Sequence, residues 1–252
     1  MNRWLVGMVM AVALIQAAGC SEVSVSGKTA KDVFQDPQTL ALVEAACHGD
    51  IPKIDALVKQ GANVNATGYR DVSVLAWAMA CKNYDGVERL LELGANPNFK
   101  MKQTGDDSPM WLAAGSSDPH FLPLMLAHGG DPNIRSGYQT ALMIAIEQER
   151  DKNVEHLIKA GADLNEHNSV GISAADFAII KGRLDYIVEL LNAGYSFELQ
   201  RLANDVSAVG AGTPYFSYKK GALDILARKG FEPKHISRHS APPPPGLGGS
   251  KT

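Results

Sequence analysis

Apolar residues along the chain gather in short segments that come in pairs. The first segment of each pair is rich in alanine, at residues 42–47, 75–81, 110–114, 142–146 and 175–180. The second segment ends in two adjacent apolar residues, such as Leu90-Leu91 and Leu157-Ile158. Short segments of this kind between polar turns are typical of helices with one apolar face. The pattern therefore predicts an all-α chain built from helix-turn-helix units.

Polar residues mark where the first helix of a pair begins. Ser73, Ser108, Thr140 and Ser173 stand directly before these helices. A serine or threonine at this position accepts a hydrogen bond from a backbone N–H of the first turn, which stabilises the helix by about 1 kcal/mol. Pro109 follows its cap directly, at a position where the missing N–H costs nothing.

A glycine-containing motif follows the second helix of each pair at regular intervals. It reads Gly61-Ala62-Asn63-Val64-Asn65, Gly94-Ala95-Asn96-Pro97-Asn98, Gly129-Gly130-Asp131-Pro132-Asn133 and Gly161-Ala162-Asp163-Leu164-Asn165, with weaker echoes at Gly194 and Gly230. Successive glycines are 33, 35, 32, 33 and 36 residues apart. A glycine just past a helix takes the left-handed conformation that ends it. Because one unit cannot bury its apolar face alone, repeats of this period are expected to stack.

Two segments carry a family resemblance. Residues 108–113 (Ser-Pro-Met-Trp-Leu-Ala) and 140–145 (Thr-Ala-Leu-Met-Ile-Ala) resemble the Thr-Pro-Leu-His-x-Ala signature of ankyrin repeats. The resemblance covers residues 38–198, although Ala76, Trp111, Met143 and Asp176 replace the signature histidine. It implies an ankyrin-repeat solenoid with hairpin fingers over residues 38–240. Five repeats are clear, and a degenerate sixth is expected as a helix at 199–209, a loop at 210–220 and a helix at 222–229.

The first residues of the chain have the pattern of an export signal. A charged Arg3 precedes an apolar run over residues 4–15, which is too short to span a bilayer. Ala-Ala-Gly-Cys at residues 17–20 resembles a bacterial lipobox, which implies a signal peptide over 1–19 and a lipid on Cys20. Ser21 after that cysteine implies sorting to the outer membrane. The alternative is cleavage by ordinary signal peptidase, which would release a soluble periplasmic protein.

Two further segments lie outside the expected repeats. Residues 20–37 are polar without a sustained period, which indicates a linker that could reach roughly 50 Å. Residues 241–252 include four consecutive prolines and are expected to be a disordered tail. The only membrane association that the sequence predicts is through the lipid.

The cysteines leave two alternatives open. Three cysteines in 252 residues exclude a disulfide scaffold. Cys47 and Cys81 fall at almost the same place in consecutive repeats. Neighbouring helices lie about 10 Å apart, and a disulfide needs Cα atoms within about 7 Å. The pair is therefore either a disulfide or two small buried side chains.

No motif indicates catalysis. The chain has no nucleophile elbow, phosphate loop or His-Glu-x-x-His sequence, and it predicts no enzyme and no cofactor. His235 and His239 are four residues apart, but two ligands without a third do not predict a metal site. A net charge of −3 gives no indication of a nucleic-acid partner.

The resemblance implies protein binding through the finger tips and the concave face of the first helices. The fingers are expected at residues 66–72, 99–107, 134–139 and 166–172. The expected contact residues are Tyr69, Arg70, Phe99, Lys100, Lys102, Asp106, Arg135, Tyr138, Glu147 and His167. Aromatic residues and arginine are enriched among the residues that dominate interface energetics.

The location and the fold together suggest two functions. Bacterial ankyrin lipoproteins of this size resemble immunity proteins of type VI secretion effectors. That resemblance implies a secreted phospholipase effector as the partner, inhibited by occlusion. The alternative is an envelope scaffold that protects a resident protein.

Overall fold

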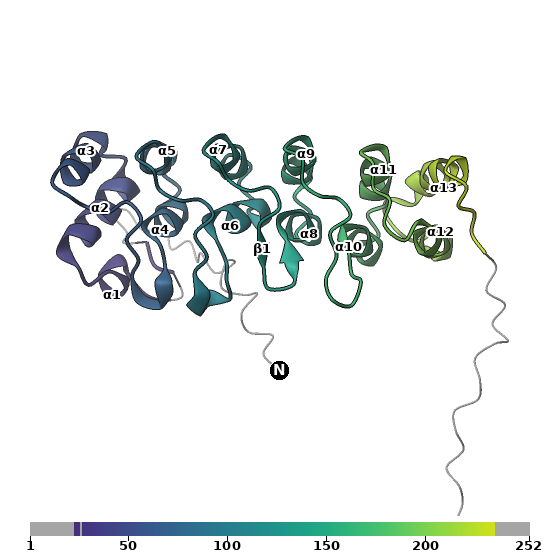
Figure 1. Cartoon of the computed structure of the whole chain (residues 1–252), viewed down its shortest axis with the longest axis horizontal. Helices are drawn as coiled ribbons and strands as arrows, with labels where there is room; N and C mark the ends of the chain where they lie inside the picture. Colours follow the sequence, from purple (N-terminus) through teal and green to yellow (C-terminus); the bar gives the residue numbers. More distant parts are fainter. Residues whose placement is uncertain (1–22, 26, 235–252) are drawn as a thin grey trace, which may run out of the picture. The chain divides into compact units, whose positions relative to one another are not determined.

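The helices of the chain come in pairs joined by short turns, as the sequence predicts (Figure 1). The computed structural model describes residues 23–25 and 27–234. The described residues divide into two units, one ending at Lys181 and the other starting at Gly182.

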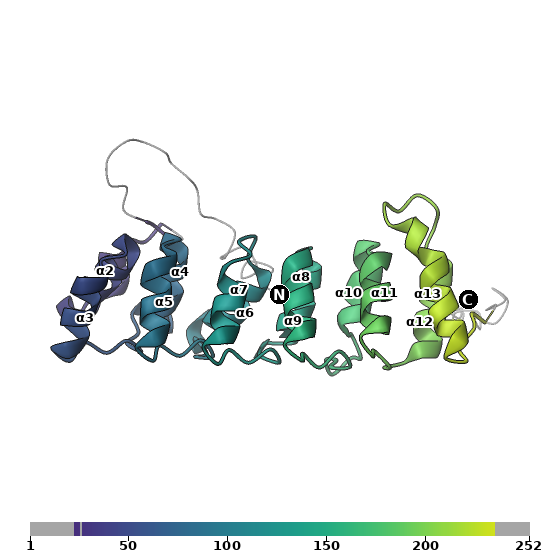
Figure 2. The same ribbon diagram turned by 90° about the horizontal axis from the view of Figure 1, so that it is seen from above.

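Inner and outer helices alternate along the first unit. The inner helices are α2 (Pro37–His48), α4 (Val74–Cys81), α6 (Pro109–Gly115), α8 (Ala141–Glu147) and α10 (Ala174–Lys181). The outer helices are α3 (Ile51–Lys59), α5 (Tyr84–Glu92), α7 (Phe121–Ala127) and α9 (Asp151–Lys159). Each inner helix packs against the inner helix of the next repeat, and each outer helix does the same (Figure 2).

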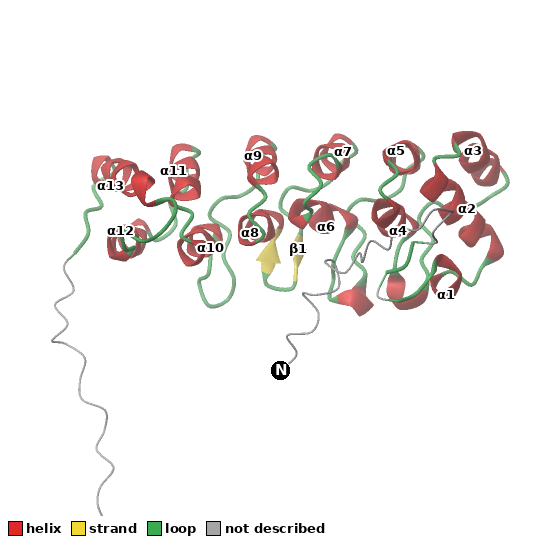
Figure 3. Cartoon of the chain, turned by 180° about the vertical axis from the view of Figure 1, so that it is seen from behind, coloured by secondary structure: helices red, strands yellow, loops and turns green. Residues whose placement is uncertain are grey.

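A finger precedes each inner helix from α4 to α10. Each finger is closed by antiparallel pairing, which joins Thr67 to Ser73, Met101 to Asp107, Arg135 to Thr140 and His167 to Ser173. The first two fingers contain the 3-10 turns η2 (Tyr69–Asp71) and η3 (Lys102–Thr104). The third contains β1 (Arg135–Ser136) and β2 (Gln139–Thr140), which form the only named strands in the described residues (Figure 3). The fold is an all-α ankyrin solenoid, as predicted.

Local sequence explains where the helices begin and end. The side chains of Ser73, Ser108 and Thr140 each accept a hydrogen bond from a backbone N–H in the first turn of their helices. The repeat glycines have positive φ, for example 91° at Gly94 and 81° at Gly129, as expected of residues that end a helix. Fully buried Leu42, Leu90, Met110 and other apolar residues from both helix rows form the core.

The segment before α2 differs from the predicted linker. Residues Ala30–Val33 form helix α1, with a buried Val33, and Phe34 is only 2% exposed. The Phe34 ring makes an edge-on contact with Trp77, with centroids 5.8 Å apart. Burial of this aromatic ring explains why residues 30–36 are folded, so this part of the expected linker over 20–37 belongs to the repeat domain instead.

The second unit contains a complete sixth helix pair. Helix α11 (Leu184–Asn192) is followed by α12 (Leu199–Ala208), the 3-10 turn η4 (Phe216–Tyr218) and α13 (Lys219–Arg228). The last helix begins three residues earlier than the sequence suggests. Residues 209–218 connect α12 to α13, and Arg183 lies between the rings of Tyr186 and Tyr215, 3.7 and 4.3 Å from their centroids.

Candidate protein-binding surface

Asparagines at the bases of the first three fingers bond to the next repeat. The Asn65 side chain donates to the Gly94 carbonyl at 2.9 Å and accepts from the Asn96 N–H at 2.7 Å. Asn98 makes the same pair of bonds to Gly129 and Asp131, at 2.8 Å each. The second asparagine of the repeat motif is therefore an inter-repeat bridge.

The first polar residue of the motif shapes the turn within its own repeat. The side chains of Asn63, Asn96, Asp131 and Asp163 each accept from the backbone N–H two residues later, at 2.8–2.9 Å. This is an Asx-turn, which starts the finger without any backbone partner from another segment.

Side-chain hydrogen bonds also connect the fingers to one another. Arg70 of the first finger donates twice to the Gln103 carbonyl of the second, at 2.7 and 3.2 Å. Ser136 of the third finger donates to Asp107 of the second at 2.5 Å. Arg135 of the third forms an ion pair with Glu166 of the fourth at 2.8 Å. The fingers are thus a connected row in which Arg70 and Arg135, both predicted to contact a partner, bind neighbouring fingers.

Several predicted contact residues do face solvent at the tips. Tyr69 and Tyr138 are 55% and 57% exposed. The side chains of Lys100, Lys102, Asp106 and His167 are also exposed, whereas Phe99 is half-buried. The exposed tyrosines combine a large apolar area with a polar tip, which suits protein recognition.

Glu147 lies at the end of inner helix α8 rather than on a finger. It is half-buried and accepts a hydrogen bond from the side chain of Gln139, which precedes that helix and is buried. Its carboxylate therefore has a partner within its own repeat.

Two exposed apolar residues were missed by the sequence analysis. Val170 on the fourth finger is 76% exposed and Ile180 on α10 is 72% exposed. Ile180 could have been recognised by aligning the repeats on the residues that cap their inner helices. In that alignment Ile180 occupies the position of Ala80 and Glu147 in other repeats. Ile180 is therefore an apolar side chain at a position that elsewhere carries a small or a charged residue, which makes it a candidate for contact with a protein partner.

Burial perturbs one carboxyl group in the second finger. Desolvation raises the pKa of Asp107 above its ordinary value of 3.8, the Ser136 hydroxyl opposes this by donating to it, and the nearby charge of Asp106 adds to the rise. The ionised form is therefore disfavoured by the folded state.

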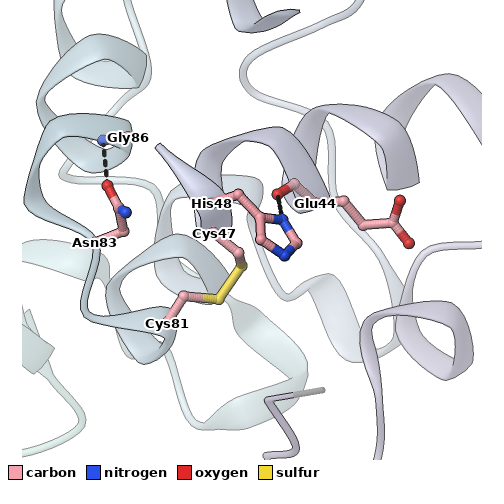
Figure 4. The surroundings of a disulfide bond; sticks show 6 residues. All are labelled: Glu44, Cys47, His48, Cys81, Asn83 and Gly86. Carbon is pink, nitrogen blue, oxygen red and sulfur yellow. Dashed lines mark hydrogen bonds between the residues drawn. A yellow bond between two sulfur atoms is a disulfide. The ribbon is translucent and has the colours of Figure 1, made fainter. Parts of the chain in front are cut away.

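Cys47 and Cys81 are joined in a disulfide, with Cα atoms 5.1 Å apart. It connects the last turns of α2 and α4 (Figure 4). Beside it the Asn83 side chain accepts from the Gly86 N–H at 3.0 Å and caps α5. A Cβ atom at Gly86 would collide with the Ala46 carbonyl oxygen, so the first two repeats approach closely at this seam.

A polar cluster that the sequence did not indicate joins the second and third repeats. Tyr84 donates to Asp118 at 2.5 Å, and His120 Nδ1 lies 2.9 Å from the same carboxylate. Burial opposes ionisation of Asp118, but the bonds from Tyr84 and His120 outweigh it and hold the pKa of Asp118 below its ordinary value. The Tyr84 ring also packs against Phe121, with centroids 5.3 Å apart. The cluster fastens α5 to the turn before α7.

Within residues 23–25 and 27–234, no three histidine, cysteine or acidic side chains are grouped so that they could hold a metal ion. No helix there is long and apolar enough to cross a membrane. Cys20, His235, His239 and the expected tail at 241–252 lie outside the described residues.

A family model described as "Ankyrin repeats (3 copies)" matches residues 75–168 and 110–201. The chain belongs to the ankyrin-repeat family. Ankyrin repeats are generally non-catalytic scaffolds for protein–protein interaction, so a protein partner is expected for the row of fingers.

Individual relatives share the repeats rather than a whole chain. Protein PhlB of Serratia liquefaciens is 31% identical over 140 residues, which are 55% of this chain and 60% of that protein. The mitochondrial disaggregase of Bos taurus is 30% identical over 145 residues, covering 55% and 21%. The transient receptor potential cation channel subfamily A member 1 of Drosophila melanogaster is 23% identical over 207 residues, covering 78% and 17%. The chain thus spans less than two thirds of each of these relatives.

Proposed function

We propose that this chain is a non-catalytic, protein-binding lipoprotein of the bacterial periplasm, anchored to the outer membrane by a lipid on Cys20. On this proposal it is an immunity protein that binds and inhibits a toxic effector, a type VI secreted phospholipase. The export pattern and lipobox resemblance at residues 1–20 support the location. The ankyrin fold supports a binding role, and the kind of effector follows from the resemblance alone.

The observation that carries the proposal is a row of fingers tied together by side-chain bonds and bearing exposed apolar residues. Tyr138, Val170 and Ile180 are all more than half exposed, and they belong to the third finger, the fourth finger and the helix that follows it. Because Arg135 joins the two fingers through Glu166 and the His167 carbonyl, the surface is organised before binding. A pre-organised surface loses little conformational entropy on binding, which favours tight occlusion of an enzyme.

The test begins with capture of the partner and ends with its activity. The tagged full chain would be purified with its bound proteins from the envelope of cells that carry the candidate effector. A single stoichiometric partner that hydrolyses phospholipid, and whose hydrolysis falls to zero at one equivalent of this chain, would support inhibition. A partner without an activity that the chain inhibits would instead favour the envelope scaffold. Turnover by the purified chain itself would contradict a non-catalytic role.

A surface variant then locates the contact. The triple variant Tyr138→Ala, Val170→Ser and Ile180→Ser should raise the inhibition constant for the effector by roughly thirtyfold or more. One hot-spot residue contributes about 2 kcal/mol to binding, which corresponds to that factor. The matched control replaces three exposed lysines of the outer helices, Lys53→Ser, Lys59→Ser and Lys152→Ser, and should inhibit like the parent chain. Thermal unfolding of both variants checks that the stack is intact. Full inhibition by the first variant would exclude this surface as the contact.

A further inference from the structure

The described residues begin close in sequence to the proposed lipid anchor. Val25 and Lys28 pair through their backbones, and α1 follows at Ala30. Helix α1 lies against the first finger, as Figures 1 and 3 show. A Cβ atom at Gly68 in this finger would lie 2.8 Å from the Phe34 ring and would collide with the Val33 carbonyl oxygen. Such a close approach fixes the N-terminal segment on the first finger.

The length of chain before this point limits how far the first finger can be from an anchor. Val25 is the fifth residue after Cys20. A fully extended chain spans at most about 3.5 Å per residue, or roughly 18 Å over this segment. If Cys20 carries the lipid, as the proposed function holds, the pairing at Val25 stays within roughly that distance of the bilayer surface.

The side chains on that part of the molecule suit a phospholipid surface. Lys28 Nζ lies 4.8 Å from the centroid of the Tyr69 ring, which is more than half exposed. The second finger adds exposed Lys100 and Lys102. Lys28, Tyr69, Lys100 and Lys102 are called the basic tip patch below.

The two fingers that carry the patch are held together by their own hydrogen bonds. Arg70 follows Tyr69 and donates to the carbonyl of Gln103, which follows Lys102. Four carboxylates lie on the same segments, and three of them accept hydrogen bonds within the protein: Asp32 from Thr29, Asp71 from the Gln103 side chain at 3.4 Å, and Asp107 from Ser136. With Asp106 they stand against five cations, Lys28, Lys31, Arg70, Lys100 and Lys102, which leaves a net charge of about +1. The attraction to an anionic surface would therefore come from the exposed lysines at the tips rather than from a large net charge.

We propose that the basic tip patch rests on an anionic phospholipid surface and orients the anchored stack there. Lysines near such a surface are attracted by its negative potential, and tyrosine is enriched at the level of the lipid headgroups. The proposal deepens the proposed function and rests on lipidation of Cys20. It divides the predicted contact residues into a lipid-facing group on the first two fingers and a protein-facing group on the third and fourth. The third and fourth fingers would then bind a phospholipid-hydrolysing partner next to the membrane surface on which it acts.

The experiment uses the full chain, purified from the membrane fraction and reconstituted into vesicles of phosphatidylethanolamine and phosphatidylglycerol. A small share of the lipid carries a photo-reactive headgroup, and cross-linked peptides are identified by mass spectrometry. Cross-links are expected on the peptides that contain Lys28, Tyr69 and Lys100 to Lys102. Reversing Lys28→Glu, Lys100→Glu and Lys102→Glu should lower them by roughly tenfold or more, and high salt should weaken them in the parent chain.

The control reverses three exposed lysines of the outer helices, Lys53→Glu, Lys59→Glu and Lys152→Glu, so that the net charge changes equally. It should cross-link like the parent chain. Equal loss in both variants, or cross-links centred on the outer helices, would overturn the patch. If binding of an effector abolished the cross-links of the basic tip patch, the patch would contact the protein partner rather than lipid.

The two proposals can fail separately. The mass of the N-terminal peptide reports the lipid on Cys20, and effector inhibition is measured without vesicles. Patch cross-links in a chain that inhibits no effector would support the lipid contact while removing the immunity function. A chain that lacks the lipid and makes no cross-links would contradict both the anchor and the patch.

Discussion

At the residue scale, the three specified positions of the repeated Gly-x-Asx-x-Asn motif have distinct physical roles. The glycine ends the outer helix, the Asx side chain closes a local turn, and the final asparagine bonds the next repeat. The first role follows from sequence because glycine alone takes positive φ without strain. The last does not, because its partners are about thirty residues away in the chain.

The bridging asparagine gives the first prediction. Asn98→Ala removes two bonds to the backbone of the next repeat and leaves the Gly129 carbonyl and the Asp131 N–H without their partner. The free energy of unfolding should fall by about 1–3 kcal/mol. Urea titration followed by circular dichroism measures it. Lys59→Ala, on an exposed outer position, should change it by no more than about 0.5 kcal/mol, and an equal loss in both would contradict the bridge.

Asp107 gives a prediction about pH. Because burial raises its pKa in the folded state, the folded chain binds this proton more tightly than the unfolded chain. The contribution of Asp107 to stability is therefore most favourable below the ordinary carboxyl pKa of 3.8, and it falls as pH rises through the raised value.

Asp107→Asn should remove this part of the pH dependence, since asparagine keeps an oxygen that accepts from Ser136 but carries no charge. Unfolding free energies measured across the acidic range should show that the variant gains stability relative to the parent chain as pH rises through the raised pKa of Asp107, with no loss at neutral pH. A difference between the two chains that does not change with pH would mean that the fold does not disfavour the ionised form of Asp107.

The hydrogen-bond partners of the arginines in the fingers could not be predicted from the sequence. Arg70 and Arg135 were expected to contact a partner because arginine is common in interfaces. The structure directs both guanidinium groups to neighbouring fingers. Sequence could not distinguish the two uses, since the acceptors are the Gln103 and His167 carbonyls and the Glu166 carboxylate, each supplied by another repeat.

At the element scale, the helices that repeat were predictable and the one that does not repeat was missed. Period, caps and glycines located every inner and outer helix of the first unit from α2 onward. Helix α1 has four residues and no counterpart in other repeats, so periodicity could not reveal it. Its stability comes from a long-range contact between Phe34 and Trp77.

That contact leads to a prediction for the N-terminal segment. Phe34→Ala should destabilise the first unit by about 3–5 kcal/mol, because it removes a buried ring and leaves a cavity beside Trp77. Thermal and urea unfolding would measure the loss. Gln35→Ala, an exposed neighbour, should have little effect. If Phe34→Ala changed the free energy of unfolding as little as Gln35→Ala, residues 30–36 would contribute little to the stability of the fold.

At the scale of the whole molecule, each repeat of the first unit is stabilised mainly by contacts with the adjacent repeats. Inner helices contact the inner helices on either side, and outer helices do likewise. Stacks of this kind behave approximately as a chain of repeats with nearest-neighbour coupling. A change in one repeat is therefore expected to weaken adjacent repeats most and distant ones least.

The disulfide allows this coupling to be tested without changing the sequence. Cys47 and Cys81 are 34 residues apart, and closing a loop of that length stabilises a fold by roughly 2–4 kcal/mol. Reduction should therefore increase amide hydrogen exchange in α2 and α4 strongly, in α6 less, and in α8 and α10 hardly at all. Hydrogen exchange read by mass spectrometry, with and without reductant, gives this gradient directly.

The control is the double variant Cys47→Ser and Cys81→Ser, which should exchange like the reduced chain and ignore reductant. A uniform rise over all repeats would instead mean that the first unit unfolds as one cooperative body. In that case the seam at the disulfide would control the whole row of fingers, and reducing conditions would also abolish the proposed partner binding on the third and fourth fingers. A gradient confined to the first repeats would leave that binding intact, so the same sample tested for inhibition decides between the two.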